Sequence, residues 1–243
     1  LCGLLRKSSG TACSLSLHSP SLNKDYALQL AGEGVELDPL FSDCSGKHAG
    51  MLAVCQYQGH SINDYPSPGH PVQRQLLRMI ADICRYSESE VAVGVDGCSV
   101  PVHALPLYNM ALGYARMANP GYLPEDKRRA ADHIFEAMNR HPWMIAGTGG
   151  FCTDLMHHTH GKLMGKIGAQ GVYCVGLKNK NMGIAVKMED GSMDRLQPVV
   201  MQVLMTLRNT VNPAVSMMSL TKWERPGLFF ISAGQILTDQ LNG

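Results

Sequence analysis

Two apolar runs near the C-terminal end of the chain constrain its fold more than any other feature. Gly161–Val175 and Met182–Met188 are rich in β-branched and aliphatic residues, which predicts strands, and the polar stretch Lys178–Asn181 between them predicts a turn. A short strand is also expected over 91–95. Helical spacing of apolar residues predicts helices over 24–32, 45–57, 71–87, 107–117, 125–140, 153–159 and 196–207. The sequence therefore predicts an α/β (α+β) fold with a helix-rich middle and a late pair of strands.

Composition narrows the class of protein further. A chain of 243 residues suits one large domain or two small ones, and 45% apolar with 17% charged residues excludes a disordered chain. The net charge of +1 excludes a general nucleic-acid or membrane-surface binder, and no apolar run is long enough to predict a transmembrane helix. The eight cysteines are scattered along a chain that also contains 15 methionines. This pattern favours a reducing, cytoplasmic compartment over a disulfide framework.

The motif Cys44–Gly50 (CSGKHAG) gathers a thiol, a hydroxyl, an amine and an imidazole at the start of a predicted helix. The amide donors at a helix N-terminus favour a thiolate at Cys44. Lys47 and His48 follow three and four positions later, so their side chains share a helix face with Cys44. The same residues also fit a Ser N-cap beside a packed cysteine, because a free cysteine is commonly a small buried apolar residue.

A second motif, Asp96-Gly97-Cys98, follows the predicted strand over 91–95. Strand ends that lead into loops are where α/β folds place their sites, although an ordinary Asp-Gly turn also fits these residues. Two thiols from separate loops plus one nitrogen would form a zinc site with three protein ligands and an open position. Lys47 would be an unusual ligand, because its amine must be neutral to bind a metal. The chain has no CxxC or HExxH spacing to support a metal site independently.

A third motif, Lys166-Ile167-Gly168, lies within a predicted strand. A lysine on an inner strand can present a basic group to a neighbouring serine, as in acyl-transferring enzymes of the penicillin-recognising type. The glycine leaves space for a substrate to approach the strand edge. An exposed strand lysine without a catalytic role is the alternative interpretation.

A series of motifs follows one order along the chain: Cys44–Leu52, Asp96–Pro101, Ala104–Leu107, Arg140–Pro142, Ala146–Gly149, Thr153–Met156 and Lys166–Tyr173. Together they resemble the asparaginase II family, the rhizobial-type (class 3) L-asparaginases. The resemblance implies a fold similar to serine β-lactamases and glutaminases, with an antiparallel sheet flanked by helices and a helical subdomain. It also implies a homodimer that hydrolyses the side-chain amide of L-asparagine to L-aspartate and ammonia.

The resemblance assigns roles to particular residues. The implied residues are the zinc ligands Cys44, Lys47 and Cys98, the substrate-binding residues His48 and Asp96, and the catalytic Lys166. A water would occupy the fourth position of the Zn²⁺ ion, which helps to place the substrate in this family. Lys166 would pair with a catalytic serine.

The chain also departs from the family pattern. Residues 1–17 resemble the family poorly, so the asparaginase II-like domain is expected over 18–243 without its N-terminal part. Leu1, in place of an initiator methionine, suggests a cut edge. Both catalytic serines of the family are expected upstream of this chain. Gly150 stands where a basic residue is more usual.

Two other functions fit the same residues. The first is a non-catalytic zinc- and amino-acid-binding domain, degenerate or truncated, that keeps the pocket without turnover. The second is a thiol enzyme with Cys44 as the nucleophile and His48 as the base, which predicts inactivation by alkylation and indifference to chelators. The sequence does not distinguish L-asparagine from L-glutamine or another small amide as the substrate.

Overall fold

The structure, a computed structural model, describes residues 24–35, 41–207 and 229–235. These residues divide into two compact units. Unit 1 falls within Leu1–Met79 and Glu88–Ala104, and unit 2 falls within Ile80–Ser87 and Leu105–Gly243. The division lies inside helix α4 (Pro71–Cys84), whose last residues belong to unit 2.

Unit 1 is mainly helical and carries one small antiparallel sheet. Its elements are α2 (Lys24–Gly32), α3 (Ser45–Gln58), the first part of α4, the 3-10 helix η2 (Glu88–Glu90), and the strands β1 (Ala92–Val95) and β2 (Pro101–Ala104). Helix α3 ends because Gly59 adopts a left-handed conformation (φ 71°) and its N–H bonds to the last carbonyls of the helix. A small core joins α3, α4 and the β1–β2 turn: Met51, Leu52, Cys55, Tyr65, Val72, Cys98 and Val100.

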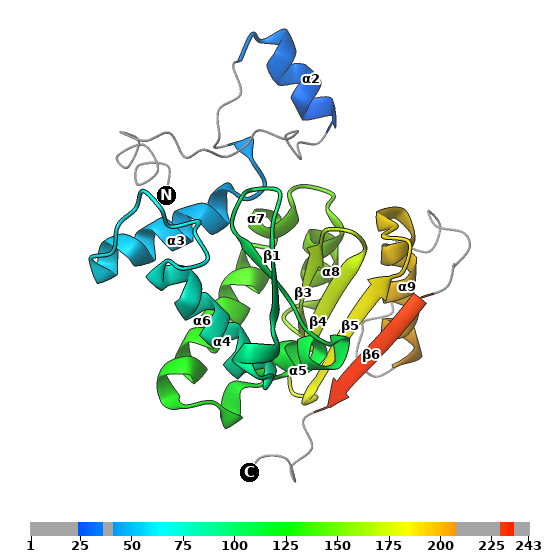
Figure 1. The fold of residues 1–243 in the computed structure, drawn as a ribbon. Coiled ribbons are helices and arrows are strands. Elements are labelled where there is room, and N and C mark those ends of the chain that lie inside the picture. Colours follow the sequence, from blue (N-terminus) through cyan, green and yellow to red (C-terminus); the bar gives the residue numbers. More distant parts are fainter. Residues whose placement is uncertain (1–23, 36–40, 208–228, 236–243) are drawn as a thin grey trace. The chain divides into compact units, whose positions relative to one another are not determined.

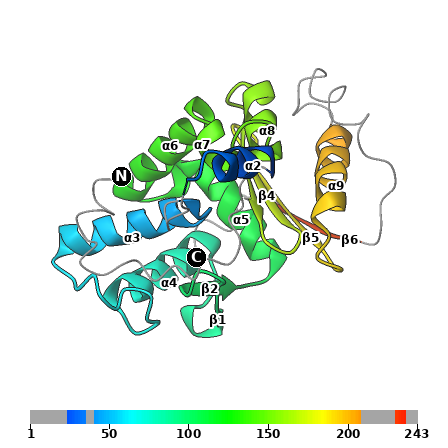
Figure 2. The same cartoon turned by 90° about the horizontal axis from the view of Figure 1, so that it is seen from above.

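Unit 2 is built on a four-stranded antiparallel sheet in the order β3-β4-β5-β6 (Figure 1). Its strands are β3 (Leu163–Gly168), β4 (Val172–Leu177), β5 (Met182–Met188) and β6 (Phe229–Gln235). Its helices, besides the end of α4, are α5 (Leu107–Ala118), η3 (Pro120–Tyr122), α6 (Glu125–Arg140), α7 (Trp143–Ala146), α8 (Phe151–Thr159) and α9 (Met193–Thr206). Figure 2 shows α5 and α9 on opposite faces of this sheet.

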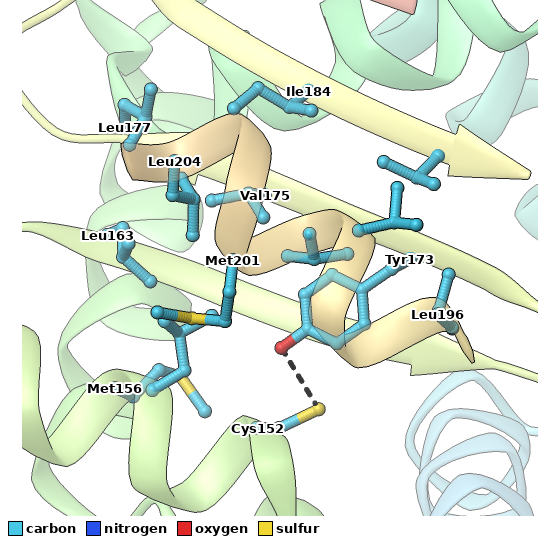
Figure 3. Close-up of a cluster of buried hydrophobic side chains, with 14 of the residues drawn as sticks. Cys152, Met156, Leu163, Tyr173, Val175, Leu177, Ile184, Leu196, Met201 and Leu204 are labelled. Carbon is cyan, nitrogen blue, oxygen red and sulfur yellow. Dashed lines mark hydrogen bonds between the residues drawn. The ribbon is translucent and has the colours of Figure 1, made fainter. Parts of the chain in front are cut away.

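Helix α5 packs very closely on its face of the sheet because that face lacks side chains at two positions. A Cβ atom on Gly183 would clash with the carbonyl oxygen of Ala111, and one on Gly176 would clash with that of Tyr114. The opposite face carries the large apolar residues that form the main core with α8 and α9 (Figure 3). The labelled side chains include Tyr173, whose hydroxyl bonds to the Cys152 sulfur at 3.4 Å.

The expected α+β fold, with an antiparallel sheet flanked by helices, is confirmed. The helix over 125–140 and the strand over 182–188 have the predicted ends, and the polar turn at 178–181 contains two left-handed asparagines, Asn179 and Asn181. These segments combine strong periodicity with turn residues that tolerate a positive φ.

The prediction of one strand over Gly161–Val175 is wrong, because the chain reverses between β3 and β4. Gln170 (φ 56°) and Gly171 (φ 74°) both adopt left-handed conformations there, and a Cβ atom on Gly171 would lie 2.7 Å from the Met188 Cβ. The helix predicted to end at Ser87 ends at Cys84. Sequence reasoning did not predict the short elements β2 and α7.

Candidate functional site

The start of α3 presents three candidate residues from one helical turn. Cys44 is the N-cap, and its carbonyl oxygen accepts the His48 N–H at 3.0 Å. The Ser42 hydroxyl in turn accepts the Cys44 N–H at 3.3 Å, so a serine turn leads the chain into the helix. Lys47 is exposed and His48 is buried, because consecutive side chains of a helix point about 100° apart.

The turn between β1 and β2 presents the other two candidates. The Asp96 N–H bonds to the Val100 carbonyl and the Ser99 N–H bonds to the Asp96 carbonyl, each at 2.9 Å. The turn is completed by Ser99, which has a φ of 71°, and by the Asp96 Oδ1, which accepts the Gly97 N–H. This hydrogen-bonded loop fixes the side chains of Asp96 and Cys98 on one side of the strand ends.

The two segments converge at one point, although they are about 50 residues apart. A sulfur atom from Cys44, a sulfur atom from Cys98 and a carboxylate oxygen of Asp96 all lie within 4.8 Å of one another. The Asp96 Oδ2 accepts hydrogen bonds from Lys47 Nζ at 2.9 Å and from Cys98 Sγ at 3.5 Å. The structure therefore brings together two free thiols, an amine and a carboxylate.

The electrostatics of this cluster follow from burial and from the ion pair. Burial raises the pKa of Cys44 to about 11 against the opposing charge of Lys47, so the thiol is protonated at neutral pH in the absence of a metal. The hydrogen bond from Lys47 lowers the pKa of Asp96. Burial opposes protonation of Lys47, but the hydrogen bond to Asp96 leaves the pKa of this amine raised.

His48 lies beside this cluster and is almost completely buried, with 1% of its surface exposed. Burial, followed by the charge of Lys47, lowers its pKa to about 4 against the opposing effect of Asp96, so the ring is neutral at pH 7. Its Nδ1 is 2.5 Å from the Tyr65 hydroxyl. Within the described part of the chain, His48 Nε2 and Asn139 Oδ1 are the two buried side-chain polar atoms without a hydrogen-bond partner. Leaving such a group unpaired costs about 1–3 kcal/mol.

Lys166 lies in β3 of unit 2, opposite Cys174 of β4. Its side chain is exposed, and its Nζ donates to the Ile167 carbonyl oxygen at 2.7 Å. The N–H of Ile167 bonds to the Cys152 sulfur of α8 at 3.3 Å, so both polar backbone groups of Ile167 are engaged, and β3 is the first strand in the order of the described sheet. Lys166 therefore lies on a strand held in place by α8.

Sequence reasoning missed Tyr65, which lies between α3 and α4. Tyr65 is 5% exposed, and its backbone carbonyl accepts a hydrogen bond from the buried Gln73 Nε2 at 2.7 Å. The ring of Tyr65 meets that of His48 edge to face, with centroids 5.6 Å apart. A tyrosine between turn residues carries no periodic signal that could have indicated this contact.

The chemistry of the cluster fits a thiophilic divalent metal. Thiolate, nitrogen and carboxylate donors are the ligands that Zn²⁺ takes in proteins. Three donor atoms within 4.8 Å of one another can approach one ion without large movements of the backbone. The site therefore has the composition of a metal centre with three protein ligands.

The comparisons with known proteins place the chain in a family. Within the described ranges, no helix combines the length and apolar character needed to cross a membrane. A search of curated proteins finds no match. The sequence model of the family described as L-asparaginase II matches residues 4–230, beginning inside the segment 1–17. Because this match covers most of the chain, the chain belongs to the L-asparaginase II family, whose members are amidohydrolases.

Proposed function

We propose that this protein is a zinc-containing amidohydrolase that converts L-asparagine to L-aspartate and ammonia. Membership of the L-asparaginase II family supports this reaction and a small-molecule substrate. The observation that carries the zinc centre is the convergence of Cys44, Asp96 and Cys98 within 4.8 Å. The geometry thus supports a metal centre at Cys44 and Cys98, two of the three ligands that the sequence indicates, and it places the third, Lys47, in a hydrogen bond with Asp96.

Cys44, Cys98 and Lys47 are the proposed zinc ligands. Both thiols would lose their protons on binding the metal, as cysteine ligands do. Lys47 would bind through its neutral amine, and this amine would still carry N–H groups for its hydrogen bond to Asp96. Asp96 would then orient the amine from the position that it already occupies, 2.9 Å from Lys47 Nζ. When bound, the ion would supply a fixed positive charge for an acceptor oxygen of the substrate.

Asp96 and His48 are the proposed substrate contacts. L-Asparagine carries an ammonium group, a carboxylate and a carboxamide. The Asp96 carboxylate is partly exposed, with 37% of its side chain accessible, and it is anionic at neutral pH, so it suits the ammonium group. The unpartnered Nε2 of His48 suits one of the oxygen or nitrogen atoms of the substrate.

Lys166 is the proposed catalytic base. It would accept the proton of a serine hydroxyl, outside the described residues, as that oxygen attacks the amide carbon. The C–N bond would break as the proton passes to the nitrogen, which leaves as ammonia. Water would then cleave the resulting ester by the same proton transfers. This step would release L-aspartate and regenerate the serine hydroxyl of the protein. Before the reaction, the amine must leave the Ile167 carbonyl oxygen so that it can face the serine hydroxyl.

Three further properties belong to this proposal. Residues 18–243 would form the catalytic domain, two copies would form a homodimer, and the protein would act in the cytoplasm, where thiol ligands stay reduced. Deletion of residues 1–17 tests the boundary, because it should leave the thermal unfolding transition unchanged. Light scattering of the purified chain tests the dimer by its mass.

The reaction is tested by ammonia release from L-asparagine, with L-glutamine as the competing substrate. Lys166→Met should abolish release, whereas Lys180→Met, which alters a turn lysine, should leave it unchanged. Binding of L-aspartate without any release of ammonia would instead support the zinc- and amino-acid-binding domain without turnover, degenerate or truncated. Inactivation by alkylation of Cys44, combined with full resistance to chelators, would establish the thiol enzyme.

A further inference from the structure

The buried pair of His48 and Tyr65 determines which hydrogen-bonding groups the histidine can offer. The two rings meet edge to face at 5.6 Å between centroids, and the Tyr65 hydroxyl lies 2.5 Å from His48 Nδ1. Both residues are buried, with 1% and 5% of their surfaces exposed. This short contact therefore occupies Nδ1 in a place that bulk water does not reach.

Tyr65 is itself held in position by a second buried side chain. Gln73 of α4 is 2% exposed, and its Nε2 donates to the Tyr65 carbonyl oxygen at 2.7 Å and to the Met51 sulfur at 3.2 Å. The Tyr65 ring also packs in the small core of unit 1 with Cys98 and Val72. The phenol thus meets His48 from a fixed backbone rather than from a free loop.

The direction of the hydrogen bond follows from the acidity of the two groups. A phenol O–H is a far better donor than a neutral imidazole N–H, and an imidazole nitrogen is a far better acceptor than a phenol oxygen. The stronger arrangement therefore has Tyr65 donating and His48 Nδ1 accepting. A neutral imidazole carries one proton, so this proton is then on Nε2.

The Nε2 atom is buried and has no hydrogen-bond partner. A buried donor without a partner is rare, and at a site it indicates a group reserved for a ligand. His48 directly follows Lys47 in the first turn of α3, and its N–H bonds to the Cys44 carbonyl oxygen at 3.0 Å, so the ring lies beside the proposed substrate site.

We propose that Tyr65 is a positioning residue that fixes His48 as the Nε2–H tautomer, so that His48 donates a hydrogen bond to a carboxylate or carboxamide oxygen of the bound amino acid. The identity of the ligand rests on the proposed function, whereas the tautomer does not. A protonated Nε2 has no lone pair available, so this arrangement excludes His48 from acting through Nε2 as a metal ligand or a general base.

The tautomer is tested by ¹⁵N NMR of the histidine rings in the 243-residue chain without substrate, with His48 assigned from the spectrum of His48→Gln. The expected result is a protonated Nε2 and an unprotonated Nδ1 in the wild type. Tyr65→Phe should remove this fixed preference. Tyr57→Phe should preserve it, because it removes an exposed hydroxyl from α3, the helix that carries His48. A protonated Nδ1 in the wild type would overturn the proposal, even if Tyr65→Phe does not fold.

The ligand is tested by calorimetric binding of L-aspartate, the product of the proposed reaction. Loss of one oriented hydrogen bond should weaken binding about tenfold in Tyr65→Phe and in His48→Leu. His48→Gln should bind more tightly than His48→Leu, because the Gln amide keeps an N–H near the position of Nε2. Equal affinities in all three variants and the wild type would refute the donor role. Absence of ammonia release with normal L-aspartate binding would count against the proposed reaction alone.

Discussion

Two lysine–aspartate pairs, one in each unit, have similar geometry but very different surroundings. Lys47 and Asp96 of unit 1 are 2.9 Å apart, with side chains 45% and 37% exposed. Lys127 and Asp82 of unit 2 are 2.6 Å apart, with side chains 37% and 47% exposed. Distance and exposure alone would assign the two pairs the same role.

The neighbours of each pair separate them. Around Asp96 lie two thiols and a buried histidine with an unpartnered nitrogen, which are groups that a protein core does not need. Around Asp82 the polar groups satisfy one another, because Arg116 donates to the Asp82 and Ile83 carbonyls at the end of α4 at 2.5 and 2.8 Å. An ion pair therefore indicates a functional site only through the unsatisfied groups beside it.

The largest expected effect concerns the thiols beside Asp96. At a zinc concentration of 100 times the Kd, the wild type should gain about 2.7 kcal/mol of stability from binding. Cys44→Ser combined with Cys98→Ser should lose this gain, because two of the three proposed ligands are removed. Urea unfolding with and without zinc measures this gain in stability. Cys84→Ser provides a control, because it alters a thiol outside the cluster. Zinc stabilisation that persists in the double variant would show that the metal binds elsewhere.

The next effect belongs to the other pair and concerns folding alone. Arg116→Met should destabilise the protein by about 2 kcal/mol, because it leaves two helix-terminal carbonyls without their charged donor. Zinc affinity should not change. Arg195→Met, which removes an exposed arginine 3.5 Å from Asp190, should change stability by less than about 0.5 kcal/mol. Equal unfolding midpoints for the two variants would contradict a capping role for Arg116.

The third prediction compares the same change, Asp to Asn, in each of the two pairs. Asp96→Asn should weaken zinc binding about tenfold, because the amide no longer holds the amine of Lys47 through an ionic hydrogen bond. Asp82→Asn should leave zinc affinity unchanged. Competition with a chromogenic chelator measures both constants. A loss of zinc affinity far greater in Asp96→Asn than in Lys47→Met would identify Asp96, rather than Lys47, as the third ligand.

The fold could be predicted where one physical signal dominates. Glu125–Arg140 has the expected ends because its apolar residues recur at helical spacing between Pro124 and His141-Pro142. The break between β3 and β4 was missed because Gln170 seldom adopts a positive φ and both flanking runs are apolar. A reversal of only three residues, 169–171, within an apolar run leaves the pattern of a single strand.

The candidate site shows the same division. Cys44 and Asp96 were selected because they share short motifs with other reactive groups, and the structure brings these motifs together. Tyr65 could not be selected, because its role depends on a contact with His48, 17 positions away, and on support from Gln73. Such contacts are set by tertiary packing and leave no trace in local spacing.

The smallest expected effect completes the comparison of the two pairs. Lys127→Met should change the free energy of unfolding by less than about 0.5 kcal/mol, because an exposed ion pair gains little over the hydration of its separate charges and loses side-chain entropy. A higher salt concentration should bring the difference in unfolding free energy between this variant and the wild type closer to zero, because salt screens exposed charges. Urea unfolding at low and high salt measures both values. A loss above about 1.5 kcal/mol would show that Lys127 supports the end of α4 together with Arg116, and the contrast between the two pairs would then rest on the thiols and the histidine alone.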